Sequence, residues 1–201
     1  AKEGVLVARN QSMTPAEQIA FAARLGELFP SPKPSETVPE GLIQIKADER
    51  SKGAAGTAWH TDVSSEARPP SISMLRMEVV PPVGGDTLFM DMRQVFSNLS
   101  AKMQDLLKQL SARHDPVGHY LYLSGQKALH ELPSGHHPIV RQIPETGDVA
   151  LYVNEGFTRG IDGLAESESK FLLRFLFDTI RASVPAQIRV KWQPDTIVFW
   201  D

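Results

Sequence analysis

The spacing of hydrophobic and polar residues changes several times between the two-residue period of strands and the longer period of helices. Ile188, Val190 and Trp192 alternate with polar neighbours, a pattern that predicts a half-buried strand. Residues 166–181 repeat their apolar positions every three or four residues, which predicts a long amphipathic helix. Shorter apolar runs predict further strands at 4–8, 42–45, 72–80, 86–90, 138–141, 149–153 and 196–201.

Two further helical regions are predicted in the first half of the chain. Thr14 precedes Pro15 and lies three residues before Glu17, which is the sequence pattern of a capping box at a helix start. The apolar positions that follow predict a helix that reaches Leu28 and packs one face on the core. Residues 91–110 are also helical in character and are expected to form two helices.

The order of these elements favours a mostly β structure with flanking helices. The helices do not alternate regularly with the strands, so a doubly wound parallel sheet is not expected. A mostly antiparallel arrangement fits better, and a closed jelly roll that holds a ligand at its mouth is one such architecture. Residues 112–135 are polar and have no clear period, which predicts a lid or loop in this region.

Composition narrows the classes of function. The 201 residues are 41% hydrophobic and 22% charged, with a formal net charge of -3, as in ordinary globular domains. No basic run interleaved with aromatic residues is present, so nucleic-acid binding is not expected. No apolar stretch approaches the roughly 20 residues that span a bilayer, so we expect no membrane segment and a cytoplasmic location. The absence of cysteine leaves His, Asp and Glu as candidate metal ligands.

The densest candidate chemistry lies at His60 and Asp62, which one residue separates. On an extended strand, residues two positions apart point to the same side, so the imidazole and the carboxylate are expected to converge. One histidine and one carboxylate are two members of the 2-His-1-carboxylate triad that binds Fe(II). A surface hydrogen bond between the two side chains is the simpler alternative, because short motifs often occur by chance.

Five segments extend this motif over nearly the whole chain. They are 59–63 (Trp-His-Thr-Asp-Val), 84–88 (Gly-Gly-Asp-Thr-Leu), 137–141 (His-Pro-Ile-Val-Arg), 153–158 (Val-Asn-Glu-Gly-Phe-Thr) and 192–201 (Trp-Gln-Pro-Asp-Thr-Ile-Val-Phe-Trp-Asp). In content and order they resemble the Fe(II)/2-oxoglutarate-dependent dioxygenases of the TauD/TfdA family, which contains taurine dioxygenase and 2,4-dichlorophenoxyacetate dioxygenase. The resemblance implies a double-stranded β-helix (jelly-roll) core of the clavaminate synthase-like type.

The resemblance implies roles for three polar residues. His60 and Asp62 match two of the family's iron ligands, and Thr87 matches the threonine whose hydroxyl helps to hold the carboxylate of 2-oxoglutarate. The implied cofactors are Fe(II), 2-oxoglutarate as cosubstrate and O2. The expected reaction is hydroxylation of a small organic substrate, coupled to decarboxylation of 2-oxoglutarate to succinate and CO2. Asp62 argues against a halogenase, because halogenating relatives carry a small residue at this position.

The resemblance also implies a substrate pocket. Val63 and Phe157 match residues that line the family's pocket, and Asn154 is expected to lie beside them. Ordinary structural roles stay open for each residue. Val63 and Phe157 are apolar and would be buried in most proteins, Asn154 would satisfy a loop, and Thr87 would cap a turn.

The chain departs from the family pattern at Asp201, where it ends. In the family, the second iron-binding histidine follows this stretch, and an arginine further on binds the distal carboxylate of 2-oxoglutarate. We therefore expect residues 1–201 to be a single dioxygenase domain that is truncated at both ends. His136 and His137 are weak candidates for the third ligand, and His137 is expected to be structural.

The other histidines fall in or near the polar segment 112–135. For His114 and His119, a solvated loop is expected rather than contact with a substrate.

Two positions bear on the substrate. Sulfonate-using members carry a histidine where this chain has Ser31, and an asparagine where it has Gly56. Both contacts to the anion are therefore missing. Taurine is disfavoured as the substrate, and another small molecule is favoured.

Two other classes of function stay open. A catalytically inactive relative that acts as a binding protein is expected if Asp201 is the genuine end of the protein. A metal-dependent hydrolase or isomerase on a similar barrel would need further His or Glu ligands near His60. The expected partner is a small-molecule substrate, with no nucleic acid and no membrane, and the resemblance allows a homo-oligomer.

Overall fold

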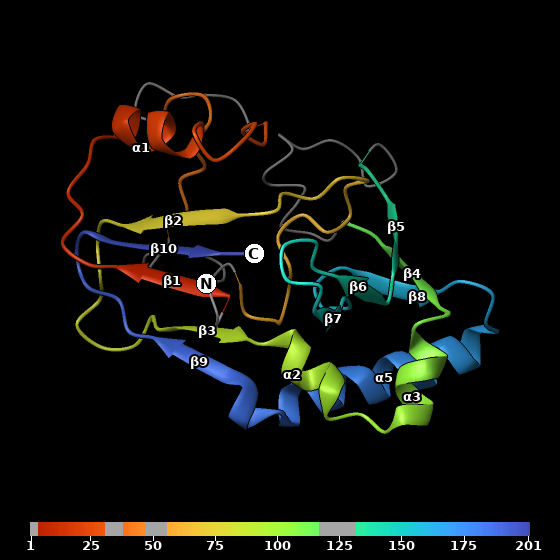
Figure 1. Ribbon diagram of the computed structural model, residues 1–201. Coiled ribbons are helices and arrows are strands. Elements are labelled where there is room, and N and C mark those ends of the chain that lie inside the picture. Colours follow the sequence, from red (N-terminus) through yellow and green to blue (C-terminus); the bar gives the residue numbers. More distant parts are fainter. Residues whose placement is uncertain (1–3, 31–37, 47–55, 117–131) are drawn as a thin grey trace.

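The computed structural model describes residues 4–30, 38–46, 56–116 and 132–201, where antiparallel strands form four sheets flanked by helices (Figure 1). The strands are β1 (Val5–Ala8), β2 (Ser73–Met77), β3 (Thr87–Met90), β4 (Ser111–His114), β5 (Gly135–Pro138), β6 (Val140–Gln142), β7 (Val149–Leu151), β8 (Thr158–Ile161), β9 (Gln187–Val190) and β10 (Thr196–Trp200). The helices are α1 (Pro15–Ala22), α2 (Met92–Ser97), α3 (Ala101–Leu107), α5 (Glu166–Ala182) and the 3-10 helix η2 (Val184–Ala186). This confirms the predicted class, mostly β with flanking helices.

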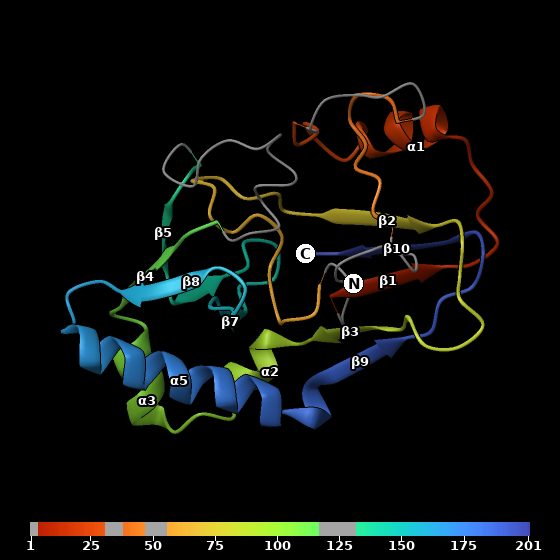
Figure 2. The same cartoon turned by 180° about the vertical axis from the view of Figure 1, so that it is seen from behind.

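The first sheet brings distant parts of the chain together. β10 lies between β1 and β2, so Trp200 is paired with Val5 on one side and with Ser73 on the other. The two-stranded β3–β9 sheet lies next to it in both views (Figures 1 and 2). Both sheets contribute to one hydrophobic cluster, whose buried members are Val190, Trp192 and Val198. This packing fixes the end of β10 beside the start of β2.

The other two sheets, β5–β4–β8 and β6–β7, share a larger core with the helices α2, α3 and α5. Helix α5 runs along this part of the molecule in Figure 2 and packs against β8 and α2. Ile139 connects the two sheets, because its N–H donates to Leu110 and its carbonyl accepts from Tyr152. Through Ile139, the residue that follows β7 is therefore tied to the residue that precedes β4.

The predicted helices are largely present. The capping box at Thr14 and Glu17 is confirmed, with both reciprocal hydrogen bonds formed. However, α1 ends at Ala22 and none of its residues is buried, so the expected core-facing helix up to Leu28 was wrong. Helix α1 contacts the first sheet through Phe21, whose ring centroid lies 5.8 Å from that of Phe199 in β10. In the described part of the chain, no helix is long and apolar enough to cross a membrane.

The differences between the predicted and observed strands have a common cause. No strand forms at 42–45, whereas β4 and the start of β5 lie in the segment 112–135, where a lid or loop was predicted. β8 was not predicted either. In β4 and β8 the inward positions are held partly by polar residues, His114 and Thr158, both of which are buried. A pattern of apolar residues does not detect strands of this kind.

Candidate metal centre

His60 and Asp62 lie in the loop that precedes β2, and their side chains converge. His60 Nε2 is 3.4 Å from Asp62 Oδ1, and the two side chains are 32% and 38% exposed. The expected extended strand was wrong, because residues 59–61 have no regular structure and residues 62–65 form turns. The turn, rather than strand alternation, brings the imidazole and the carboxylate together.

Each of the two side chains is oriented by a further hydrogen bond. His60 Nδ1 lies 2.9 Å from the carbonyl oxygen of Ala58, a contact in which this nitrogen carries the proton and Nε2 faces Asp62. Asp62 Oδ2 accepts a hydrogen bond from Ser73 Oγ at 2.6 Å. The Trp200 side chain also lowers the pKa of this carboxyl. The carboxylate is thus held by Ser73 at the start of β2.

These contacts set the charge of the pair. The hydrogen bond with Asp62 raises the pKa of His60, while partial burial acts in the opposite direction. Burial alone would raise the pKa of Asp62, but the hydrogen bonds from His60 and Ser73 outweigh it and lower that pKa. Asp62 is therefore an anion at neutral pH, the form in which a carboxylate binds a metal.

The pair has the donor chemistry of a non-haem Fe(II) site. An imidazole nitrogen and a carboxylate oxygen are the ligand types of the facial triad. A hydrogen bond from the other ring nitrogen to a carbonyl, as at Ala58, is the usual support of a metal-bound histidine. Over the described ranges, no group of three or more His, Cys, Asp or Glu side chains could hold a metal. The described residues therefore fit two positions of such a site, those of His60 and Asp62.

Two other histidines have partners of their own. His136 is exposed and pairs with Asp162, 2.9 Å from its Oδ2. His137 is buried in β5, and its Nε2 lies 2.9 Å from the carbonyl oxygen of Ser64 and 3.0 Å from that of Glu66. Both contacts of His137 are structural and hold the end of the loop that carries the pair.

His114 differs from its prediction. It was expected in a solvated loop, but β4 directs it inward and its side chain is fully buried. Its Nδ1 lies 3.0 Å from Ser64 Oγ and its Nε2 lies 3.3 Å from Thr158 Oγ1. Burial lowers the pKa of His114 to about 4, so the ring is neutral at pH 7. His119 and His130 lie outside the described residues.

Thr87 is the first residue of β3 and is connected to the pair by aromatic side chains. Its Oγ1 accepts a hydrogen bond from Trp192 Nε1 at 2.9 Å. Phe89 lies two residues further along the same face of β3, and its ring packs at 5.2 Å against Trp200, whose side chain lowers the pKa of the Asp62 carboxyl. A hydroxyl oxygen that accepts one bond can still donate its proton to another group.

The three residues of the expected substrate pocket do come together. Val63 packs against a buried cluster of Phe157 and Leu132. Asn154 is buried, its Nδ2 donates to Ser64 Oγ at 3.1 Å, and its Oδ1 accepts from the Phe157 N–H at 2.7 Å. Both polar atoms of this amide are engaged within the protein. Contact between Asn154 and a substrate stays a prediction.

Three residues that hold the pair were not predicted, namely Ser64, Ser73 and Trp200. Two predicted strands, 72–80 and 196–201, contained Ser73 and Trp200, and pairing these strands in register would have found both. Ser64 follows the motif by two residues. Its partners come from distant segments, so no local pattern marks it.

Comparison with known proteins now identifies the family. The family model described as "Taurine catabolism dioxygenase TauD, TfdA family" matches residues 1–201. The chain belongs to the TauD/TfdA family of dioxygenases. It is 33% identical over 219 aligned residues to the alpha-ketoglutarate-dependent sulfonate dioxygenase of Saccharomyces cerevisiae, with all of this chain and 52% of that protein covered. The chain thus spans about half the length of this relative.

Bacterial relatives have similar levels of identity. The (S)-phenoxypropionate/alpha-ketoglutarate-dioxygenase of Sphingobium herbicidovorans is 32% identical, and the alignment covers 98% of this chain and 73% of that protein. The crystal structure of a taurine dioxygenase from Burkholderia xenovorans superposes with a TM-score of 0.79 at 30% identity, covering 98% of this chain and 66% of that one. Sequence and structure therefore agree on TauD/TfdA membership.

The TauD/TfdA pattern also bears on Gly56. A Cβ atom at this position would lie 3.4 Å from Cε1 of His60, so a side chain here would reach the candidate metal-binding pair. Glycine leaves that space open. Ser31, the second position considered for a sulfonate contact, lies outside the described residues.

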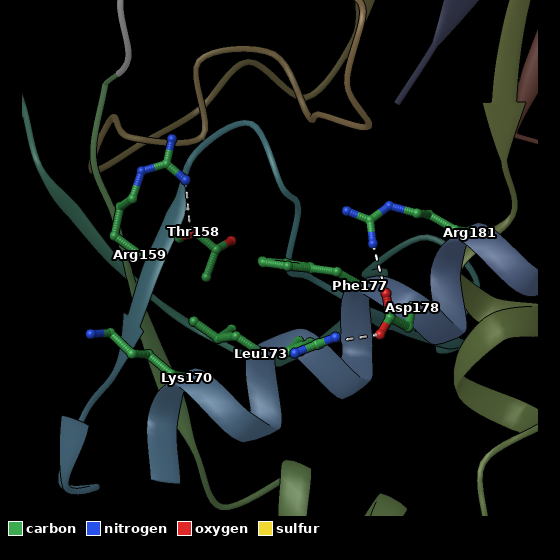
Figure 3. Close-up of a pocket in the computed structure, with 8 residues that line it drawn as sticks. Thr158, Arg159, Lys170, Leu173, Phe177, Asp178 and Arg181 are labelled. Atoms are coloured by element: carbon green, nitrogen blue, oxygen red, sulfur yellow. Dashed lines mark hydrogen bonds and ion pairs between the residues drawn. The ribbon is translucent and has the colours of Figure 1, made fainter. Parts of the chain in front are cut away.

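A separate groove of 440 Å³ lies between β8 and α5 (Figure 3). It is lined by Thr158, Arg159, Lys170, Leu173, Arg174, Phe177, Asp178 and Arg181. Two of its cations share an acidic partner, Asp178, whose carboxylate pairs with Arg181 at 2.7 Å and with Arg174 at 3.8 Å. None of the residues predicted for the TauD/TfdA site lines this groove.

Proposed function

We propose that this protein is an Fe(II)/2-oxoglutarate-dependent dioxygenase that hydroxylates a small organic substrate and converts 2-oxoglutarate to succinate and CO2. The observation that carries the proposal is the 3.4 Å approach of His60 Nε2 to Asp62 Oδ1 in a chain that matches the TauD/TfdA family throughout. When bound at this pair, Fe(II) and 2-oxoglutarate supply the activation of O2.

The residues of this chain would act as ligands and as orienting groups. His60 and Asp62 would bind the metal, with Ala58 and Ser73 fixing their directions through hydrogen bonds of 2.9 and 2.6 Å. Thr87 would donate its hydroxyl proton to a carboxylate of 2-oxoglutarate, since its oxygen already accepts from the indole of Trp192. None of the described residues is assigned the role of the family's second histidine ligand or that of its arginine, which binds 2-oxoglutarate.

We further propose that the substrate contacts Val63 and Phe157. Val63 follows Asp62 directly, and its side chain packs on Phe157. The two side chains therefore pack together beside the proposed metal site. Taurine stays disfavoured, because Gly56 leaves open the position of the family's asparagine.

We infer that the strands belong to a double-stranded β-helix, a single domain in which the pair lies at the mouth. Support comes from the TauD/TfdA relatives and from the superposition with the taurine dioxygenase structure. The alternative of an inactive binding protein gains no support from the relatives, which are named as dioxygenases.

The test is an anaerobic titration of the purified protein with Fe(II) and 2-oxoglutarate, followed by visible absorption. We expect a charge-transfer band that requires both additions and disappears in His60→Ala. His136→Ala is the matched control, because this exposed histidine pairs with Asp162 instead. A folded protein that forms no band with both additions would contradict the proposed function.

A further inference from the structure

A closed ring of buried hydrogen bonds lies against the loop that carries the metal-binding pair. We call residues 59–66 the metal-site loop and name as the polar ring the four side chains Ser64, His114, Asn154 and Thr158, all of which are buried. His114 Nδ1 lies 3.0 Å from Ser64 Oγ, and its Nε2 lies 3.3 Å from Thr158 Oγ1. Asn154 completes the ring, with its N–H donating to Thr158 Oγ1 at 2.9 Å and its Nδ2 donating to Ser64 Oγ at 3.1 Å.

The ring contacts the metal-site loop at two places. Ser64 is itself a member of the loop and lies two residues after Asp62. Gly156 lies between Asn154 and Thr158 in the sequence, and its N–H donates to the carbonyl of Trp59 at 3.0 Å. It also packs closely on the ligand, since a Cβ atom at Gly156 would lie only 2.8 Å from Cβ of His60. The segment 154–158, which carries two members of the ring, thus touches the loop at Trp59, before the pair, and at Ser64, after it.

The loop needs such support because its backbone is strained between its two contacts with the ring. Val63 has φ of 43°, a left-handed conformation that β-branched residues rarely adopt. Its side chain packs on Phe157, whose N–H donates to Asn154 Oδ1 at 2.7 Å. Asn154 therefore binds both neighbours of Val63: Ser64, which follows it in the sequence, and Phe157, on which it packs. Strained conformations of this kind persist only where the surrounding structure fixes them.

The polar character of this region is itself informative. Burying a polar group costs desolvation free energy. A network of buried polar groups therefore usually specifies one arrangement and does not stabilise the fold more than an apolar core would. Here the ring and His137, which lies within hydrogen-bonding distance of two carbonyls of the loop, direct their polar atoms to the metal-site loop. The arrangement specifies the conformation of one loop.

We propose that the polar ring positions the metal ligands: it holds the metal-site loop in the turn that brings His60 and Asp62 together. In this respect the inference deepens the proposed function, on which it rests. The ring residues are positioning residues, since they act on the pair through Ser64 and Gly156. Asn154 thereby takes a role in the architecture of the site instead of in substrate contact.

The test uses Thr158, whose hydroxyl can be removed at constant volume. Thr158→Val removes the hydroxyl from the ring, whereas Thr158→Ser keeps it. The matched control is Ser169→Ala, because Ser169 is also buried and its hydroxyl accepts one bond, from Ile161 N–H at 2.9 Å, away from the loop. The probe is Co(II) alone, titrated by its visible absorption. We expect Thr158→Val to weaken Co(II) binding about tenfold or more, and Thr158→Ser and Ser169→Ala to bind as the wild type does.

Hydrogen exchange of the metal-free protein provides a second readout that needs no metal. We expect the amides of Ser64 and Gly156 to exchange faster in Thr158→Val than in Ser169→Ala at matched thermal stability. Unchanged exchange of the loop in Thr158→Val would overturn the proposal. If that variant does not fold, Ser64→Ala replaces it. Failure of the wild type to bind Co(II) would contradict the proposed function, while the exchange data would still decide whether the ring holds the loop.

Discussion

Ser73 Oγ donates a hydrogen bond to Asp62 Oδ2 over 2.6 Å, and this contact ties the carboxylate of the proposed metal-binding pair to the first residue of β2. Ser73 is paired in register with Trp200, whose side chain also lowers the pKa of this carboxyl. The sheet thus determines where the carboxylate lies, and the loop determines where the imidazole lies. The two ligands are supported by different parts of the fold.

Ser73→Ala should therefore weaken metal binding without unfolding the protein. Loss of the hydroxyl frees Asp62 to rotate and removes a bond that lowers its pKa. We expect metal affinity to fall about tenfold and the free energy of unfolding to fall by about 1 kcal/mol. Metal titration and urea unfolding measure the two effects. Ser134→Ala is the control, since Ser134 makes an equally short bond, 2.6 Å, to Asp115; equal losses of affinity in both variants would refute the role of Ser73.

Gly156→Ala should disturb the pair by steric contact. The added Cβ would lie 2.8 Å from Cβ of His60, so either the turn at Gly156 or the loop must shift. We expect a loss of about 1–3 kcal/mol in unfolding free energy together with a loss of metal affinity. Gly160→Ala is a matched control on β8, because no atom lies within 4 Å of its added Cβ. A Gly156→Ala protein that is as stable as Gly160→Ala and binds metal normally would show that the contact is relaxed at no cost.

Burial of His114 should make the protein less stable in mild acid. In the unfolded chain this histidine binds a proton near its ordinary pKa of 6.5, but in the folded protein it does so only near 4. The unfolded state therefore gains protons first as the pH falls, and stability is lost between these two values. Between pH 7 and 5 the loss should be about 2 kcal/mol. Urea unfolding at both pH values measures it, with His114→Gln expected to lose less than the wild type does.

The predictable parts of the fold are those in which local chemistry is sufficient. The capping box of Thr14 and Glu17 and the apolar period of α5 depend on residues close in sequence, and both formed as expected. β4 and β8 were missed because buried positions there hold His114 and Thr158, which a search for apolar residues treats as exposed. Their burial becomes understandable only once the polar ring is known, and the ring joins three segments that are distant in sequence.

The candidate site was predictable to a similar extent. The motif and the resemblance pointed to His60 and Asp62, and the structure brings these two side chains to 3.4 Å, although through a turn instead of a strand. The supporting contacts from Ser73 and Trp200 depend on strand pairing across more than a hundred residues of sequence. The identity of Gly56 was evident in the sequence, but its approach to the His60 ring depends on the positive φ of 77° that curves the chain there.

Thr87→Val should separate cosubstrate binding from metal binding. Valine keeps the volume of the side chain but has no hydroxyl to donate to a carboxylate of 2-oxoglutarate. We expect the KM for 2-oxoglutarate to rise about tenfold, as for loss of one hydrogen bond to a charged group, while the affinity for Fe(II) alone is unchanged. The Trp192 N–H also loses its acceptor, so the free energy of unfolding should fall by about 1–2 kcal/mol. Thr87→Ser retains the hydroxyl and should keep both the KM for 2-oxoglutarate and the bond from Trp192. An unchanged KM in Thr87→Val would show that Thr87 only accepts the bond from Trp192 and does not bind 2-oxoglutarate.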